Sequence, residues 1–173
     1  KTLRAANGAP VSLELLVQRR EDERLALAYR RMLAQIGIDL SVRLVDASQY
    51  QRRLQNFDFD MIIYSYYASL SPGNEQAYYW GSAAAETPGS RNYAGIKNAA
   101  VDAAITALTH AATLDDFTAA ARALDRSLMT GHYFVPLFHT DKQWVAHWNQ
   151  LEHPYQHSLY GMRLESWWLN QNN

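Results

Sequence analysis

The chain of 173 residues is long enough for one compact domain with a substantial core and leaves little for a second. Its 16 basic and 17 acidic side chains give a net charge of -1, so no overall field favours nucleic acid or an anionic membrane surface. No apolar run approaches the roughly 20 residues that a membrane-spanning helix needs. The absence of cysteine excludes disulfides and thiolate chemistry. We therefore expect one domain, or one lobe of a larger protein, with no nucleic-acid partner.

The start of the chain alternates between strand and helix patterns. Residues 11–17 change from alternating to continuously apolar, which is typical of a strand covered on both faces. A helix is expected next, with acidic residues at 21–23, apolar residues spaced three and four apart, and Gly37 as its C-terminal cap. Residues 38–44 alternate with a period of two, which predicts a second strand.

A short helix and a third strand follow. Ser48 is expected to cap a helix that carries Tyr50, Leu54 and Phe57 on one side. The near-continuous apolar run at residues 59–64 is a candidate central strand. Three strands joined by two helices form a βαβαβ unit, so we predict an α/β fold with a mainly parallel sheet and flanking helices.

The pattern changes after the third strand. Residues 65–96 are rich in Tyr, Ser, Gly, Ala and Asn, and this stretch is long for a connection, so we expect it to be functional or partly helical. A helix is then expected from the apolar spacing between Val101 and Leu108. Thr113 and Asp116 have capping spacing and are expected to open a second helix, which ends near a glycine.

The last part of the chain is predicted to be extended and is rich in aromatic residues. Residues 133–138 and 143–148 have the character of short extended pieces. The tryptophans in this part are Trp144, Trp148, Trp167 and Trp168. Such a group could face another protein, so a partner-binding module is one alternative function.

The motifs of several catalytic and nucleotide-binding classes are missing. The first strand runs into Gln18-Arg19-Arg20, where a phosphate-binding loop would need glycines. The third strand ends in tyrosines rather than in the acidic cluster of a phosphoacceptor domain, and no Gly-x-Ser-x-Gly elbow occurs. We therefore expect neither an enzyme nor a bound cofactor.

Histidines near the end of the chain leave a metal site as a rival hypothesis. They are His132, His139, His147, His153 and His157. Pro154 interrupts the i,i+4 pair His153 and His157, and no acidic residue completes a His-Glu-x-x-His motif. Surface or packing roles are favoured, and the alternative is a stand-alone α/β metal-dependent hydrolase that uses this region.

Residues 64–75, directly after the third strand, are the main candidate for function. In open parallel sheets, ligands lie beyond the carboxyl ends of the strands, which is where this segment emerges. Tyrosines offer large amphipathic surfaces at little rotamer cost, and Ser and Asn offer adaptable hydrogen bonds, a mixture suited to binding. The alternative is that these tyrosines simply pack under the helices that follow.

Several motifs in order resemble a known family. They are Phe-Asp-Phe-Asp-Met-Ile-Ile at 57–63, Ser-Leu-Ser-Pro-Gly-Asn-Glu-Gln at 69–76, Tyr-Trp-Gly-Ser at 79–82, Gly-Ser-Arg-Asn-Tyr-Ala-Gly-Ile-Lys at 89–97 and Val-Asp at 101–102. Together they resemble the C-terminal lobe of extracellular solute-binding proteins of family 5, the receptors of ATP-driven importers of oligopeptides, dipeptides and nickel. The subgroup linked to peptide and microcin C uptake is most similar, since it shares Ser-Pro-Gly-Asn-Glu and Gly-His-Tyr-x-Val-Pro at 131–136.

The resemblance implies a type II periplasmic-binding-protein lobe that binds without chemistry. Residues 1–173 would form one lobe, the C-terminal part of a larger two-lobed protein, and residues 150–173 would pack on the other lobe. Hinge closure would bury a peptide-like solute between the lobes. The implied partners are that solute, the N-terminal lobe of the same protein and an ABC permease in the inner membrane. The implied location is the periplasm, or the cell exterior at the membrane.

The resemblance also suggests site residues. Tyr66 matches an aromatic position, and Ser69 matches an aspartate that pairs with the α-amino group of a peptide in oligopeptide-binding relatives. Ser69 carries no charge, so a free-amine clamp would need Glu75 as a substitute. We hypothesise that the cleft side of this lobe is lined by Tyr64, Tyr66, Tyr67, Ser69, Asn74, Glu75, Arg91 and Asn92. Asp102 is expected to have a structural or helix-start role.

Overall fold

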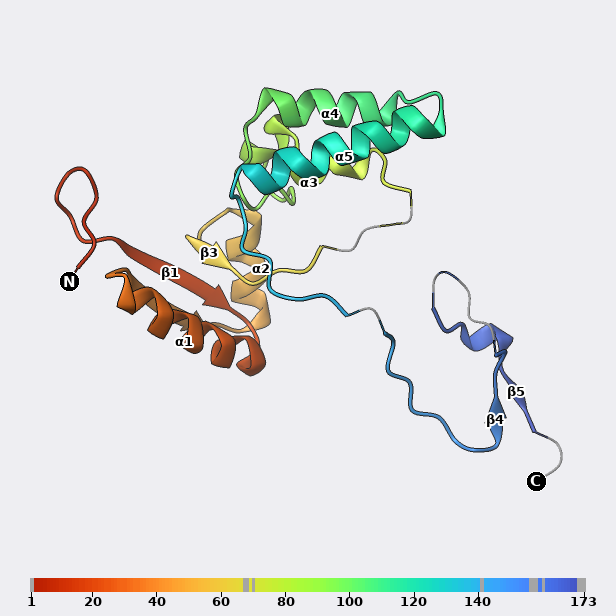
Figure 1. The fold of residues 1–173 in the computed structure, drawn as a ribbon. Coiled ribbons are helices and arrows are strands. Elements are labelled where there is room, and N and C mark those ends of the chain that lie inside the picture. Colours follow the sequence, from red (N-terminus) through yellow and green to blue (C-terminus); the bar gives the residue numbers. More distant parts are fainter. Residues whose placement is uncertain are drawn as a thin grey trace. The chain divides into compact units, whose positions relative to one another are not determined.

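The computed structural model describes residues 2–66, 69, 71–140, 142–155, 159 and 161–170 (Figure 1). The chain divides into two compact units, Lys1–Phe134 and Val135–Asn173, here called unit 1 and unit 2. A search of the described residues for a helix of sufficient length and apolar character to span a bilayer finds none.

Unit 1 opens with a three-stranded parallel sheet of order β2-β1-β3. Strand β1 (Ser12–Val17) pairs along its whole length with β2 (Asp39–Leu44) and, at its carboxyl end, with β3 (Met61–Ile62). The predicted βαβαβ unit with a parallel sheet is therefore confirmed. The third strand is shorter than predicted, and it lies at the edge of the described sheet, so the prediction that it is central is wrong: β1 has the central place.

Helix α1 (Arg20–Gln35) covers one face of the sheet, as its apolar spacing predicts (Figure 1). Leu15, Val17 and Leu40 of the strands pack with Ala26 of the helix. Gly37 ends the helical stretch with a φ of 85°, in the left-handed region that glycine adopts without strain. The neighbouring strand residue Leu16 points to the opposite face, so β1 is buried on both sides as expected.

Helix α2 (Ala47–Gln55) covers that opposite face by placing Tyr50 and Leu54 against Leu16. The predicted cap is wrong. Asp46, not Ser48, precedes the first helical residue, and its carboxylate accepts a hydrogen bond of 2.8 Å from the Gln49 backbone N–H. Ser48 already lies inside the first turn, where its hydroxyl cannot serve as the cap.

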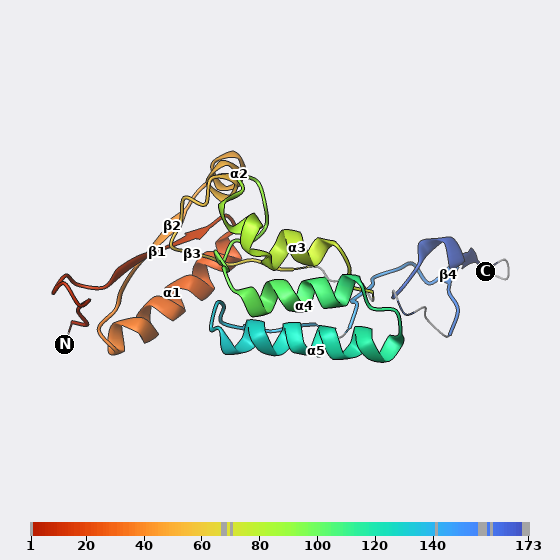
Figure 2. The same cartoon turned by 90° about the horizontal axis from the view of Figure 1, so that it is seen from above.

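The second half of unit 1 is helical. It contains α3 (Glu75–Trp80), the 3₁₀ helix η1 (Ser82–Glu86), α4 (Ala99–Thr109) and α5 (Leu114–Thr130). The expectation that residues 65–96 are partly helical is confirmed. Thr113 caps α5 as predicted, because its Oγ1 accepts a hydrogen bond from the Asp116 backbone N–H at 3.1 Å. Helices α4 and α5 lie side by side, with α3 next to α4 (Figure 2).

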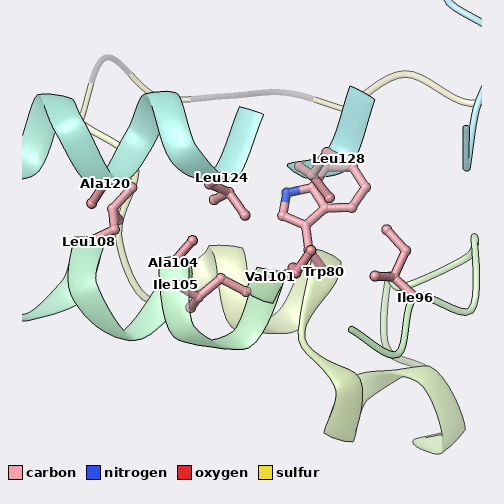
Figure 3. Close-up of a cluster of buried hydrophobic side chains, with 9 residues drawn as sticks. All are labelled: Trp80, Ile96, Val101, Ala104, Ile105, Leu108, Ala120, Leu124 and Leu128. Carbon is pink, nitrogen blue, oxygen red and sulfur yellow. The ribbon is translucent and has the colours of Figure 1, made fainter. Parts of the chain in front are cut away.

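These helices enclose a second apolar core (Figure 3). Its buried members are Trp80, Ile96, Val101, Ala104, Ile105, Leu108, Ala120, Leu124 and Leu128. The Trp80 side chain projects from α3 into this core, and its Nε1 donates a hydrogen bond of 2.9 Å to Gln76 Oε1. Trp80 therefore fixes the position of α3, which directly follows the candidate binding segment.

Unit 2 has little regular structure in its described residues. Strands β4 (Leu151–Glu152) and β5 (Trp168–Leu169) pair antiparallel, and the 3₁₀ helix η2 spans Leu164–Ser166. The described residues of the expected extended pieces at 133–138 and 143–148 belong to no strand or helix. Large apolar side chains in this unit are exposed, including Phe138 at 82% and Trp144 at 91%.

Candidate functional site

Aromatic side chains meet where the chain leaves β3. Tyr64 and Tyr66 follow β3 two residues apart, and both contact other aromatic rings. The ring of Tyr64 lies 4.9 Å from that of Tyr66 and 4.8 Å from that of Tyr93, in edge-on contacts. Tyr66 lies 4.4 Å from Trp80 and 5.6 Å from Tyr79. We call Tyr64, Tyr66, Tyr79, Trp80 and Tyr93 the aromatic ladder.

The ladder joins elements that are far apart in sequence. Tyr64 and Tyr66 come from the β3 exit, Tyr79 and Trp80 from α3, and Tyr93 from the loop before α4. At its other end, Tyr93 contacts Phe59 beside the α2 face of the sheet. The ladder thus links the apolar cluster under α2 to the core between α4 and α5, which makes it a fixed surface rather than a set of separate side chains.

The hydroxyls of Tyr66 and Tyr93 are protonated at neutral pH. Burial raises the pKa of Tyr66 above its usual range, and burial followed by the nearby Tyr64 raises the pKa of Tyr93 to about 12. Both phenols therefore keep their protons. The Tyr66 hydroxyl donates a hydrogen bond of 3.2 Å to the Arg91 carbonyl oxygen, which ties the loop before α4 to the β3 exit.

Arg91 lies against the ladder. The central carbon of its guanidinium is 5.8 Å from the centre of the Tyr79 ring, and its Nη1 donates a hydrogen bond of 3.4 Å to the Tyr79 hydroxyl. The side chain remains exposed. In the part of the chain that the structure describes, no carboxylate forms an ion pair with Arg91.

Asn92 has a different role from the one we expected. Its side chain is completely buried, with an exposed fraction of 0%. Its Nδ2 donates hydrogen bonds of 2.9 Å to the carbonyl oxygens of Gly81 and Ile96, and its Oδ1 accepts one of 2.9 Å from the Ile96 N–H. Asn92 therefore holds its loop together, and the expectation that its side chain lines an open face is corrected.

The polar residues before α3 form a local turn. Ser69 Oγ donates a hydrogen bond of 2.8 Å to the Ser71 carbonyl, and Asn74 is exposed. Glu75 Oε1 accepts hydrogen bonds from the Gly73 backbone N–H at 2.9 Å and from Gln76 Nε2 at 3.2 Å. The Gly73 N–H, as the main cause, holds the pKa of Glu75 below its usual value. Tyr67, also expected here, lies outside the described residues.

Asp102 has the structural role that we expected. It lies in the first turn of α4, and its two carboxylate oxygens accept hydrogen bonds from the Ser82 backbone N–H at 2.8 Å and the Ser82 hydroxyl at 2.6 Å. These contacts join the start of α4 to η1. They also fix the end of α3, from which Tyr79 and Trp80 extend.

A separate hollow of about 750 Å³ lies beside α2, and no ladder residue lines it. Its lining is mostly charged or polar: Glu14, Arg43, Val45, Gln49, Arg52, Arg53, Asn56 and Asp58. Arg53 bridges Glu14 at 2.7 Å and Asp58 at 2.9 Å. Since ligand pockets are mainly apolar, this open hollow is less suited to burying a solute than the ladder is.

The histidine-rich region gives no support to a metal centre among the described residues. His147 and His153 have ring centres 5.5 Å apart and both contact Trp167. Within the described ranges, no group of three or more His, Cys, Asp or Glu side chains could hold a metal ion. His157, the partner of His153 in the sequence pattern, lies outside the described residues.

The ladder partners Tyr79, Trp80 and Tyr93 were missing from the expected site. Their sequence signal is weak, because each belongs to a different segment and no spacing rule connects them. Tyr79 and Trp80 do fall in one of the motifs that carry the family resemblance, and Tyr93 falls in another. That membership is the one signal that could have indicated them.

A parallel βαβαβ sheet with flanking helices is the α/β fold that this chain shares with solved periplasmic binding proteins. Residues 2–88 match the family of bacterial extracellular solute-binding proteins, family 5 Middle. The chain belongs to this family.

Similar proteins extend well beyond this chain. A candidate binding protein of Brucella melitensis is 48% identical over 161 residues, which cover 93% of this chain and 26% of the relative. From Agrobacterium fabrum, the peptidoglycan-binding protein YepA is 45% identical over 163 residues, 94% of this chain and 26% of that protein. YejA of the same organism, named a probable peptide-binding protein, is 44% identical over 169 residues, 97% of this chain and 28% of that protein. The chain thus spans about a quarter of the length of these relatives.

Solved structures share the fold at low sequence identity. The oligopeptide-binding protein AppA of Bacillus subtilis, in complex with a nonapeptide, matches with a TM-score of 0.71 and 19% identity over 96% of this chain and 33% of AppA. NikZ of Campylobacter jejuni, in complex with Ni(L-His), matches with a TM-score of 0.64 and 13% identity over 76% of this chain and 28% of NikZ. These similarities confirm the predicted α/β fold class.

Proposed function

We propose that this chain is the C-terminal lobe of a receptor that binds peptide-like solutes between two lobes and delivers them to an ABC importer permease. The observation that carries the proposal is the aromatic ladder beyond the carboxyl end of β3. Ligands of parallel α/β lobes lie at this edge of the sheet. Half-buried tyrosines that keep their protons provide both a stacking surface and hydrogen-bond donors, which suits recognition rather than chemistry.

Two lobes are needed for a tight complex. The ladder presents one wall, and a solute on one wall keeps its other side in water, so most of its apolar surface stays hydrated. The similar proteins are more than three times as long as this chain, which leaves room for a second wall. In the proposed receptor that wall belongs to the N-terminal lobe, and hinge closure brings the two together.

The proposed solute class is peptides and peptide-bearing fragments of peptidoglycan. The names of two similar proteins, a peptide-binding YejA and a peptidoglycan-binding YepA, favour this class. The fold by itself does not distinguish solutes, since proteins of the same fold hold a nonapeptide in one case and Ni(L-His) in another. Tyrosine rings and hydroxyls suit the mixed apolar and amide surface of a peptide.

The proposed location is the periplasm, or the cell exterior at the membrane, in keeping with a family of extracellular proteins. The proposed role needs no catalytic residue and no cofactor. In the same proposal, the end of the chain at 150–173 packs on the N-terminal lobe. Exposed apolar side chains in unit 2, such as Leu159 at 89% and Leu164 at 76%, support this because they lack cover within the described chain.

Isothermal calorimetry with a random tetrapeptide library tests the receptor function. We expect the complete gene product that contains this chain to bind the library, and the 173-residue chain alone to bind weakly or not at all. Tyr66→Ala should weaken binding at least tenfold because it removes the centre of the ladder, whereas Met32→Ala, which changes an apolar side chain of α1 that is 64% exposed, is the control and should leave binding unchanged. Submicromolar binding by the isolated chain would contradict the two-wall proposal, and no binding by the complete protein would reject the receptor function.

A further inference from the structure

Arg91 is the one described cation that is stacked on an aromatic ring. Three other basic side chains have carboxylate partners: Arg19 pairs with Asp22, Arg53 with Glu14 and Asp58, and Lys97 with Glu86. Arg91 instead lies over Tyr79 and donates to its hydroxyl, with no described acid in an ion pair. Its positive charge therefore remains uncompensated at the edge of the ladder.

The backbone of Arg91 is fixed on both sides. Its N–H donates to the Tyr78 carbonyl at 3.3 Å, and its carbonyl accepts from the Tyr66 hydroxyl at 3.2 Å. The next residue is the buried Asn92, which is held by three hydrogen bonds. The guanidinium thus extends from a rigid point and is oriented by Tyr79, although its surface is exposed. Such preorganisation reduces the entropy lost when a ligand group is bound.

The acidic and hydroxyl groups beside the ladder are less suited to hold a cation. Ser69 is neutral, and its hydroxyl donates to Ser71 within its own turn. One carboxylate oxygen of Glu75 is engaged by Gly73 and Gln76. Arg91 is the charged side chain that is stacked on a ladder ring, and a solute group that pairs with its guanidinium has to be negative.

We propose that Arg91 binds a carboxylate of the solute while the aromatic ladder contacts the adjoining peptide. The inference rests on the proposed receptor function. A guanidinium matches a carboxylate with two parallel N–H···O hydrogen bonds, and these charge-assisted bonds are stronger than neutral ones. Tyr79 acts as a positioning residue, since it orients the guanidinium by its ring and its hydroxyl. The carboxylate is either the C-terminus of a peptide or an acidic side chain within it.

Three tetrapeptide libraries distinguish the two sources, with the complete gene product as the protein. The first has free C-termini and no Asp or Glu, the second has amidated C-termini and no Asp or Glu, and the third has amidated C-termini and one Glu per peptide. Equilibrium dialysis with quantification by mass spectrometry measures the affinity for each. The wild type is expected to bind the first or the third library about tenfold or more tightly than the second. Preference for the first assigns the terminal carboxylate, and preference for the third assigns the side chain.

Arg91→Gln should abolish this preference, because it removes the positive charge that pairs with the carboxylate. Arg91→Lys keeps the charge but loses the planar fork, so it should retain only part of the preference. Arg52→Gln removes another exposed arginine charge, from α2, and serves as the matched control, with wild-type preferences expected. Tyr79→Phe keeps the ring but loses the hydroxyl acceptor, and should reduce the preference less than Arg91→Gln does.

The outcomes separate this inference from the receptor function. Binding of all three libraries with equal affinity by the wild type would overturn the carboxylate anchor and leave the receptor function intact. A preference for carboxylates that survives in Arg91→Gln would also overturn the anchor. If the wild type binds none of the libraries, the receptor function and the anchor are both rejected.

Discussion

The two units of the chain differ in how far their apolar side chains are buried. Unit 1 buries them in three clusters, one on each face of the sheet and one among α3, α4 and α5. Leu16, Leu40, Ile96 and Val101 are 0% exposed there. In unit 2, Trp144 is 91% exposed, Trp148 77% and Tyr155 97%. Composition is therefore not what separates the units: apolar residues are present in both, and among the described residues the facing elements that cover them belong to unit 1.

The same contrast holds for polar groups. In unit 1, the fully buried Asn92 uses its side-chain amide in three hydrogen bonds. In unit 2, the buried Nε1 of Trp167 has no hydrogen-bond partner among the described residues. The buried polar side chain of Asn92 is thus satisfied within unit 1, whereas the described part of unit 2 has exposed apolar side chains and an unpaired buried N–H. This difference supports our proposal that the chain end packs on another lobe.

Truncating an apolar side chain should give the largest difference between the units. Leu16→Ala should lower the free energy of unfolding by about 3 kcal/mol, because it removes a fully buried side chain between β1 and α2. Leu164→Ala in unit 2 is the matched control and should cost less than about 0.5 kcal/mol, since Leu164 is 76% exposed. Urea unfolding of the 173-residue chain measures both. Similar losses in the two variants would break the comparison.

Removal of a buried amide should have the next largest effect. Asn92→Ala should destabilise unit 1 by about 2 kcal/mol, because it leaves the N–H of Ile96 and the carbonyls of Gly81 and Ile96 without their partner. Asn74→Ala is the control, because Asn74 is exposed and its side chain makes no capping hydrogen bond to α3. Its effect on stability should be close to zero. Hydrogen exchange at Ile96 should accelerate only in the first variant. An unchanged exchange rate there would argue against the role of Asn92 in its loop.

Changes at the N-terminal cap of α2 should have a smaller effect on stability. They also test which residue caps the helix, Asp46 or Ser48. Asp46→Ala should lower stability by about 1 kcal/mol, because the Gln49 N–H loses its acceptor. Ser48→Ala should have little effect, since Ser48 lies inside the helix. Thermal unfolding followed by circular dichroism compares them. A larger loss of stability in Ser48→Ala than in Asp46→Ala would show that Ser48 caps α2 and would contradict the role of Asp46.

The smallest expected effect is a pH dependence at Glu75. The pKa of Glu75 is lowered in the folded state, mainly by the Gly73 N–H. The ionised carboxylate therefore stabilises the fold fully above the unfolded pKa near 4.5, and this stabilisation is lost as the pH falls through the lower folded pKa. In Glu75→Gln, the midpoint of urea unfolding should fall less between pH 6 and pH 3 than it does in the wild type. Glu165→Gln, an exposed change in unit 2, should leave the wild-type profile unaltered. Parallel profiles for wild type and Glu75→Gln would contradict the assignment.

Much of the fold of unit 1 could be predicted from local patterns. The period of two in β2, the helical spacing of α1, and the caps at Gly37 and Thr113 all depend on neighbours within a few residues. The errors arose where a choice depended on distant contacts. Ser48 and Asp46 both suit a cap, and the place of β3 at the sheet edge depends on which strands pair, which no local period encodes.

The candidate site was predicted in part. Tyr64 and Tyr66 were expected from their place after the third strand, and Arg91 from its motif, and the structure brings these three together at the ladder. Tyr79, Trp80 and Tyr93 were missed, because ring contacts between separate loops have no sequence period. Asn92 was misassigned for a related reason: an amide suits a ligand as well as it suits a loop, and only its burial distinguishes the two roles.

The sequence by itself determined the class of fold, the parallel sheet, the helices and the family, because these depend on local periodicity, capping and ordered motifs. Only the tertiary structure decided which side chains meet. It made Asn92 part of a loop, gathered five aromatic rings from three segments, and left the guanidinium of Arg91 stacked and without an acidic partner among the described residues. The physical reason is that burial and pairing are properties of contacts between distant segments, and such contacts exist only after the chain has folded.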